Sequence, residues 1–109
     1  MKHLLALTVL LLTSCATVLG QGTTKVRWYG KEYDGRKTAS GEIFYHYGLT
    51  CASNSLPFGT KVEVTYNGKT AVVTVNDRGP NLIEITHKAF AFLADPSVGV
   101  IEAQYKIVK

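Results

Sequence analysis

The sequence predicts a small, mostly β protein with one short helix, most simply a closed barrel in a single domain. Three observations support this class. The chain of 109 residues is short enough for one domain of ordinary size. Apolar and polar residues alternate in several short segments, as in strands with one buried face, and only one segment has helical spacing. A composition of 46 % hydrophobic and 18 % charged residues is globular and excludes a disordered or collagen-like chain.

The first predicted elements are a strand and a long loop. Residues 25–29 alternate and predict a strand, and residues 21–24 are interpreted as a short linker before it. Between Gly30 and Gly48 no period is sustained, and four glycines interrupt the segment. We therefore expect a long ordered loop, which in a compact domain is usually functional.

The clearest local pattern is a β-hairpin. Residues 61–66 alternate, and Asn67-Gly68 follows them. This pair is preferred in two-residue turns because both positions need a positive φ. Residues 69–75 are β-branched and nearly continuous, which predicts a strand buried on both faces, inside a closed barrel or sandwich.

The C-terminal part predicts a turn, a helix and a last strand. Residues 76–80 (Asn-Asp-Arg-Gly-Pro) break the pattern, and residues 82–85 are a short apolar run. Thr86 can cap a helix that ends at Asp95-Pro96, because proline disfavours helix in the preceding residue. Residues 101–107 alternate again and predict the last strand. The apolar positions at helical spacing are Ala89, Phe90 and Leu93.

Residues 1–20 resemble an export signal. Lys2 and His3 precede an apolar run over residues 4–12. That length suits a signal-peptide core of about 7–15 residues and is short for a membrane span of about 20. Two cleavage sites compete. Leu-Thr-Ser-Cys at 12–15 resembles a lipobox, which would place a lipid on Cys15, whereas cleavage after Gly20 would discard this cysteine. We therefore expect an exported protein of the cell envelope, either anchored by that lipid or released.

Charge and cysteine content restrict the other possibilities. Residues 21–109 carry 11 Lys/Arg and 8 Asp/Glu, and this net charge of +3 is too small to indicate a polyanionic partner. Without Cys15, Cys51 is alone, so we expect no internal disulfide and interpret Cys51 as a buried small residue. The sequence contains no metal-binding or nucleotide-binding motif. We expect no cofactor, no metal and a monomer that does not bind nucleic acid.

Two carboxylates and a group of aromatic residues are candidates for chemistry. Asp77 follows the predicted buried strand, where a barrel mouth can tune its proton affinity, although it can also bond only to amides of its own turn. Glu42 lies in the long loop and can equally be an exposed acid. Exposed rings suit the faces of sugars or bases, and packing in small cores under the loops is the alternative. The aromatic residues are Trp28, Tyr29, Tyr33, Phe44, Tyr45, Tyr47 and Phe58.

Four stretches resemble the rare lipoprotein A (RlpA)-like family, in the family's order and with similar spacing over residues 27–94. They are Trp-Tyr-Gly at 28–30, Gly-Arg-Lys-Thr-Ala-Ser-Gly-Glu at 35–42, Leu-Pro-Phe-Gly-Thr at 56–60 and Val-Asn-Asp-Arg-Gly-Pro at 75–80. The resemblance implies a six-stranded double-psi β-barrel over residues 25–109. It also implies an envelope function on peptidoglycan. Characterised members are lytic transglycosylases that cleave peptide-poor glycan strands and leave 1,6-anhydro ends.

The same resemblance implies roles for individual residues. Asp77 matches the acid/base and Glu42 a second acidic position in the same groove, while Arg78 would help bind or orient the glycan. Trp28 and Tyr29, from the aromatic group, are further candidates for substrate binding, as are Ser53 and Glu84. Two positions depart from the family pattern within the expected groove. Ser53 stands where the family has a histidine linked to activity, and a serine cannot carry the charge of an imidazolium. Glu84 stands where the family has an aspartate.

These departures leave two hypotheses. The first is an endolytic peptidoglycan transglycosylase with Asp77 as its acid/base. The second is a non-catalytic barrel that binds peptidoglycan or another carbohydrate, as expansin-like and barwin-like relatives of this fold do. His46 lies seven residues before Ser53 in the sequence and is a candidate to replace the missing histidine.

Overall fold

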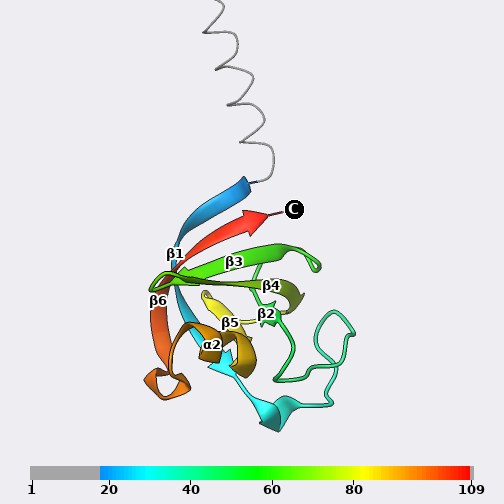
Figure 1. The fold of residues 1–109 in the computed structure, drawn as a ribbon. Helices are drawn as coiled ribbons and strands as arrows, with labels where there is room; N and C mark the ends of the chain where they lie inside the picture. The colour runs from blue at the N-terminus through cyan, green and yellow to red at the C-terminus, as the bar shows by residue number, and fades with distance from the viewer. Residues whose placement is uncertain (1–17, 109) are drawn as a thin grey trace, which may run out of the picture.

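A computed structural model describes residues 18–108 of the chain, so Cys15 and most of the predicted signal segment lie outside the described residues. Within these residues, six strands, one α-helix and two short 3-10 helices follow one another (Figure 1). In order they are β1 (Val18–Tyr29), η1 (Lys31–Tyr33), β2 (Thr50–Ala52), β3 (Lys61–Tyr66), β4 (Lys69–Asp77), β5 (Ile83–Thr86), α2 (His87–Leu93), η2 (Pro96–Val98) and β6 (Val100–Val108). Within residues 18–108, no helix has the length and apolarity to cross a membrane.

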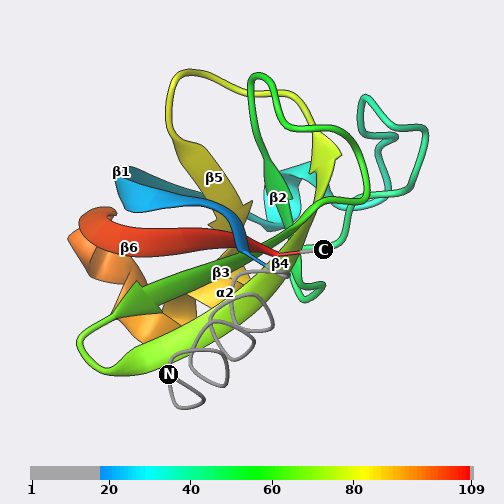
Figure 2. The same ribbon diagram turned by 90° about the horizontal axis from the view of Figure 1, so that it is seen from above.

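The strands close into a barrel in the order β1-β5-β2-β4-β3-β6 (Figures 1 and 2). The β1–β5 and β2–β4 pairs are parallel, and the other pairs are antiparallel. This confirms the predicted six-stranded barrel with one short helix. The parallel pairs join segments that are far apart in the sequence, so residues from the loop after β1, the end of β4 and the start of β5 meet on one side of the barrel.

The predicted hairpin is confirmed. Strand β3 pairs in register with β4 from Lys61–Thr74 to Tyr66–Lys69, and the two turn residues have φ of 52° and 81°. The prediction that the second strand is buried on both faces is wrong. Burial alternates along β4, and Val72 is 44 % exposed. The outer face of β4 accepts a β-branched residue because such side chains favour an extended backbone even when they are exposed to solvent.

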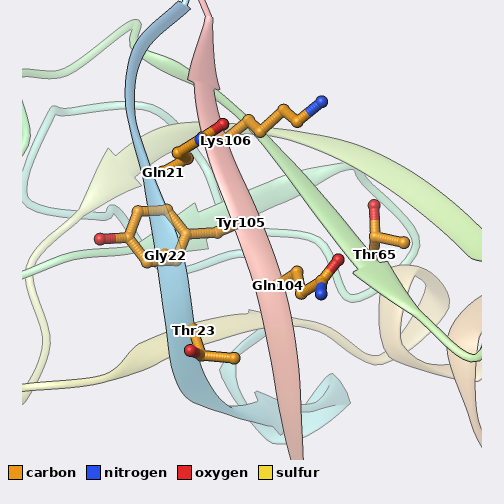
Figure 3. Close-up of a pocket in the computed structure, with 7 residues that line it drawn as sticks. All are labelled: Gln21, Gly22, Thr23, Thr65, Gln104, Tyr105 and Lys106. Carbon is orange, nitrogen blue, oxygen red and sulfur yellow. The ribbon is translucent and has the colours of Figure 1, made fainter.

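The interpretation of residues 21–24 as a linker is also wrong, because β1 begins at Val18. These residues form a ladder with β6 in which Gln21 pairs with Lys106 and Thr24 with Ala103. The strand pattern is hidden because the residues are small or polar, whereas backbone hydrogen bonds do not depend on side-chain polarity. At Gly22 the neighbouring Tyr105 ring lies so close that an added Cβ would approach Tyr105 Cε1 to 3.2 Å (Figure 3).

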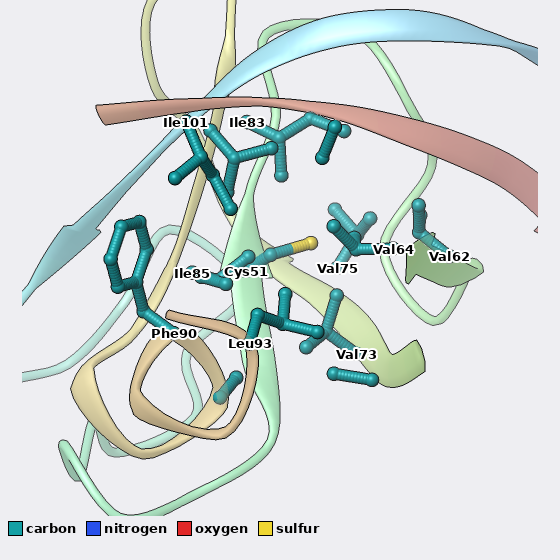
Figure 4. Close-up of a cluster of buried hydrophobic side chains, with 14 residues drawn as sticks. Cys51, Val62, Val64, Val73, Val75, Ile83, Ile85, Phe90, Leu93 and Ile101 are labelled. Atoms are coloured by element: carbon teal, nitrogen blue, oxygen red, sulfur yellow. The ribbon is translucent and has the colours of Figure 1, made fainter. Parts of the chain in front are cut away.

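The core fills the barrel and is closed at one end by α2 (Figure 4). Phe90 and Leu93 of this helix pack on strand residues that include Cys51, which is fully buried, as predicted. The predicted helix cap is confirmed, since the Thr86 hydroxyl accepts a hydrogen bond from the Ala89 N–H. The helix ends at Leu93, before the expected Asp95-Pro96 stop, where Pro96 begins η2.

The long loop after β1 has its own small core. Phe44 is buried, and its ring centroid lies 4.5 Å from that of Tyr29. Backbone hydrogen bonds from Gly35 N to Phe44 O and from Phe44 N to Arg36 O hold the two arms of the loop together. The loop is therefore ordered, as predicted, and its packing carries residues 36–42 toward the end of β4.

Candidate functional site

Asp77 is the last residue of β4, and its carboxylate is held by two backbone groups. Oδ1 accepts hydrogen bonds from Arg78 N at 2.9 Å and from Ala39 N at 3.0 Å. The first donor belongs to its own turn, but the second comes from the long loop, 38 residues away in the sequence. Oδ2 has no protein partner among the described residues. The carboxyl group is therefore fixed through one oxygen while the other is available.

A cleft of about 350 Å³ opens beside this carboxylate. It brings together four of the residues predicted from the sequence: Tyr29, Asp77, Arg78 and Glu84. The long loop supplies most of the remaining walls of the cleft, and β2 supplies one residue. These additional lining residues are Tyr33, Arg36, Lys37, Thr38, Phe44 and Ala52.

Tyr29 lines this cleft, and its hydroxyl group is buried. Its oxygen is enclosed and has no hydrogen-bond partner among the described residues. Burial raises the pKa of Tyr29 far above its usual range, and the negative charge of Asp77 raises the pKa further. The hydroxyl is therefore protonated at any physiological pH, so an unused hydrogen-bond donor lies close to the two carboxylates of the cleft.

Two charged residues of the cleft, Glu84 and Arg78, already have partners. Glu84 Oε2 accepts a hydrogen bond from Arg27 Nη2 at 2.9 Å and forms an ion pair with it. Arg78 donates to the carbonyls of Ser53, at 3.3 Å, and Leu56, at 2.9 Å. Its guanidinium also lies over the Phe58 ring, 4.0 Å from the centroid. Arg78 thus ties residues 53–58 to the end of β4.

Ser53 is adjacent to the cleft, but its hydroxyl does not line it. The side chain is 5 % exposed, and Oγ accepts hydrogen bonds from Leu56 N at 3.2 Å and Ser55 N at 3.4 Å. Only its backbone reaches Asp77, through a hydrogen bond from Ser53 N to Asp77 O. The hydroxyl stabilises the turn at residues 53–56 and borders a different pocket, together with Asn54 and others.

Glu42 lies on the other side of the loop from Asp77. Its side chain is exposed and lines a second cleft of about 550 Å³ with Tyr45 and Asn76. Asn76 and Asp77 are consecutive in β4, so their side chains point to opposite faces. The turn at residues 38–42 separates the two clefts because Ala39 N donates to Asp77 Oδ1 while Ser40 N donates to Asn76 O. Asp77 and Glu42 therefore line two different clefts, one on each side of this turn.

Trp28 and His46 line a third cleft of about 420 Å³. Trp28 precedes Tyr29 in β1 and so faces the opposite side, where its Nε1 donates to Pro96 O at 2.9 Å. The His46 Nδ1 atom lies 2.6 Å from Asp34 Oδ2. Burial favours a higher pKa for Asp34, but the hydrogen bonds and charge of His46 outweigh it, so this pKa lies below its ordinary value. His46 does not line the Asp77 cleft and does not replace the expected histidine there.

Another pocket lies on the side of the barrel formed by β1, β6 and β3. Gln104 and Thr65 project there on one side of the strands and Tyr105 on the other (Figure 3). The pocket shares no lining residue with the Asp77 cleft. Among residues 18–108, no group of three or more His, Cys, Asp or Glu side chains is placed to hold a metal ion.

Arg36 and Lys37 are the cleft residues that sequence reasoning missed. They bring positive charge beside Asp77, and Arg36 also lies 5.9 Å from the Tyr33 ring centroid. The only available indication was their position in one of the four matched stretches, since surface Arg and Lys carry no periodic pattern of their own.

Comparison with known proteins gives the family. A family model described as lytic transglycolase matches residues 21–105, which covers nearly all of the described barrel. The chain belongs to this family. Its barrel is accordingly a double-psi β-barrel, as the resemblance implied. The match includes Tyr29, Asp77, Arg78 and Glu84, which are the residues that the structure brings into one cleft.

Curated relatives and solved structures agree with this family. The chain is 42 % identical over 88 residues to the probable endolytic peptidoglycan transglycosylase RlpA of Synechocystis sp., covering 75 % of this chain and 27 % of that protein. It is 41 % identical over 85 residues to the endolytic peptidoglycan transglycosylase RlpA of Vibrio cholerae, covering 72 % and 30 %. The structure of the Streptomyces papain inhibitor superposes with a TM-score of 0.71 at 27 % identity, covering 84 % and 97 %. The chain thus spans less than a third of these two RlpA proteins.

Proposed function

We propose that the protein is an exported lytic transglycosylase that cleaves the glycan strands of peptidoglycan, with Asp77 as its general acid and base. The observation that carries the proposal is the Asp77 carboxyl group, fixed through Oδ1 and free at Oδ2 at the edge of a cleft. Membership of the family and the names of the RlpA relatives support the substrate.

The proposed reaction needs one carboxyl group and no water. Protonated Asp77 donates its proton to the glycosidic oxygen as the bond between N-acetylmuramic acid C1 and that oxygen breaks. The resulting carboxylate then takes the proton of the sugar's own 6-hydroxyl, whose oxygen forms the new bond to C1. The product is a 1,6-anhydro ring, and the acid is regenerated. A single group that serves first as acid and then as base does not require the paired carboxylates of hydrolases.

The neighbours of Asp77 take supporting roles in this proposal. The enclosed Tyr29 hydroxyl has no partner among the described residues, and in this proposal it serves as a hydrogen-bond donor to Asp77 and not to the sugar. Arg36 and Lys37 provide positive charge for the carboxylates that peptide-poor strands carry on their muramic acid residues. Glu84, paired with Arg27, borders the cleft opposite the loop. Arg78 acts as a positioning residue because its Nη1 group donates to the carbonyls of Ser53 and Leu56 and its guanidinium lies over the Phe58 ring.

The experiment compares the purified exported protein with Asp77→Asn on peptide-free glycan strands. Mass spectrometry of the products detects 1,6-anhydro-muramyl ends. The amide retains an oxygen that can accept from Ala39 N and Arg78 N, so the loop and fold should be kept. We expect the rate of cleavage to fall by about 10²–10⁴-fold, the usual contribution of a general acid or base.

The matched control is Glu102→Gln, which alters an exposed carboxylate on β6, and we expect it to cleave at the wild-type rate. Undiminished cleavage by Asp77→Asn would disprove the assigned role. If neither protein cleaves the strands but both sediment with insoluble peptidoglycan, the chain is instead the non-catalytic binding barrel.

We propose further that Cys15 is lipidated and holds the protein at a membrane of the cell envelope. The extent of β1 favours cleavage before Cys15, because this leaves the strand complete. Cleavage after Gly20 would remove the first three residues of β1 and their pairing with the end of β6. Incorporation of labelled fatty acid into the expressed protein, and its loss in Cys15→Ser, tests this; an unlabelled wild type would refute it.

A further inference from the structure

Two histidines lie together in the third cleft, the one that also contains Trp28. His46 and His87 both line this cleft of about 420 Å³, and their ring centroids are 6.2 Å apart. With bonds of about 2.0–2.1 Å from each imidazole nitrogen to a metal ion, two rings at about this spacing can share one ion. Neither histidine lines the Asp77 cleft, and the proposed reaction uses neither of them.

The contacts of the two rings leave nitrogen atoms available to a metal ion. His46 Nδ1 lies 2.6 Å from Asp34 Oδ2, so in the neutral ring Nδ1 carries the proton and Nε2 has the free lone pair. The His87 ring meets the Trp28 ring edge-on, with centroids 4.9 Å apart, and forms no hydrogen bond to another residue of the described chain. Each histidine therefore offers at least one unused imidazole nitrogen.

Asp34 gives His46 an arrangement that is typical of metal-binding histidines. A histidine that binds a metal through one nitrogen usually donates its other N–H to a carboxylate, which fixes the ring and makes the ligating nitrogen more basic. Asp34 accepts from His46 twice, from its backbone N–H at 2.7 Å and from its ring at 2.6 Å. This carboxylate thereby fixes the His46 ring in the cleft with Nε2 as its available nitrogen.

The backbone holds the two histidines at a fixed spacing. His46 belongs to the long loop, and His87 is the first residue of α2. Lys88 N donates to His46 O at 3.1 Å, which attaches the loop to the start of the helix. A second attachment follows two residues later, where the Thr86 hydroxyl donates to Gly48 O at 2.6 Å. The pair is thus preorganised, and little conformational freedom is lost when an ion binds.

The surroundings of the pair favour a cation that accepts two nitrogen ligands. Glu32 and Asp34 bring negative charge to the cleft, and the one cation among its lining residues, Lys31, is exposed. Within residues 18–108, no third His, Cys, Asp or Glu side chain is placed to complete a metal centre, so water takes the remaining positions. Imidazole and water ligands suit Cu²⁺, which also binds such ligands more tightly than Ni²⁺ or Zn²⁺ does.

We propose that His46 Nε2 and an imidazole nitrogen of His87 bind one Cu²⁺ ion in this cleft, with Asp34 orienting the His46 ring. The ion would join the long loop to α2 and so stabilise the folded chain. The site is independent of the proposed function, since its ligands lie outside the Asp77 cleft. It departs from the expectation of no metal, because its histidines come from separate segments that no sequence motif connects.

The test uses Trp28 as a reporter, because it is the single tryptophan of the chain and its ring lies against that of His87. Cu²⁺ is titrated into the purified, untagged exported protein, and quenching of the tryptophan fluorescence by this paramagnetic ion gives an apparent Kd. His87→Gln removes one ligand without breaking a hydrogen bond of the described fold, and Asp34→Asn removes the orienting carboxylate. Glu102→Gln is the matched control, because it changes an exposed carboxylate of β6 that does not line the cleft.

We expect wild type and Glu102→Gln to show saturable quenching by one equivalent of Cu²⁺, with the same apparent Kd. His87→Gln and Asp34→Asn should raise this Kd by about tenfold or more, the usual effect of losing a ligand or the group that orients it. Wild type that shows no saturable quenching would overturn the proposal. Quenching of His87→Gln with the wild-type Kd would also overturn it, because the ion would then bind at an adventitious site elsewhere on the chain.

Discussion

The hydroxyl group of Thr86 should contribute more to the free energy of unfolding of this barrel than a single polar group usually does. It is fully buried at the junction of β5 and α2. It donates to Gly48 O at 2.6 Å and accepts from Ala89 N at 3.3 Å. Thr86→Val keeps the shape of the side chain and removes both hydrogen bonds, so it tests the hydroxyl and not the packing.

The expected loss follows from those two contacts. A helix cap contributes about 0.5–2 kcal/mol, and a buried carbonyl left without its donor costs about 1–3 kcal/mol. We expect Thr86→Val to lower the free energy of unfolding by about 2–3 kcal/mol. For a domain of this size, the Tm should fall by about 10–20 °C.

Urea unfolding of wild type and both Thr86 variants provides the measurement. Thr86→Ser keeps the hydroxyl and should lose about 1 kcal/mol or less, from one buried methyl group. A loss below about 0.5 kcal/mol in Thr86→Val would refute the reasoning. An equal loss in Thr86→Ser would also refute it, because packing of the methyl group would then be the cause.

Three further predictions follow from polar groups described above. Ser53→Ala should lower the free energy of unfolding by about 1 kcal/mol, because the N–H groups of residues 55 and 56 lose their acceptor. The variant should still cleave glycan strands at a rate within about twofold of wild type. A large loss of cleavage without a loss of stability would instead give the hydroxyl a role in substrate binding. The pKa of Asp34 is lower in the folded protein than its ordinary value of 3.8, so the bond to His46 stabilises the fold at pH values above 3.8. This stabilisation is lost as the pH falls through the lower pKa of the folded state. The difference in unfolding free energy between wild type and Asp34→Asn should therefore be present at about pH 5 and close toward about pH 2, and a gap that is constant over this range would contradict the coupling. Burial raises the pKa of the Cys51 thiol to about 12, so an alkylating reagent at about pH 8 should label Cys51 only after unfolding, and rapid labelling of the native protein would count against its enclosure.

Local patterns predicted the elements whose side chains alternate or whose turns need special residues. The hairpin at Asn67-Gly68 and the cap at Thr86 are examples, because each depends on residues close together in the sequence. The N-terminal half of β1 was missed, since its partner strand β6 lies at the other end of the described chain. Burial of only one face of β4 was also missed, because a β-branched residue such as Val72 suits a strand whether it faces the core or solvent.

The sequence predicted which residues belong to the candidate site better than it predicted how they are arranged in space. Tyr29, Asp77, Arg78 and Glu84 do share one cleft. The alternation of strands explains two of the separations, since Trp28 must face away from Tyr29 and Asn76 away from Asp77. The separation of Glu42 from Asp77 could not be predicted, because it depends on how the turn at 38–42 packs against β4.

The pairing of β1 with both β5 and β6 determines when the barrel can fold. The residues that complete β1 are the last ones of the described chain, and β6 also closes the barrel against β3. The closing contacts therefore have very large sequence separation, and the loop-closure entropy must be overcome before they form. Topologies of this kind fold in about milliseconds to seconds. The growing chain thus cannot complete the described barrel until β6 has been synthesised, however early β1 leaves the ribosome.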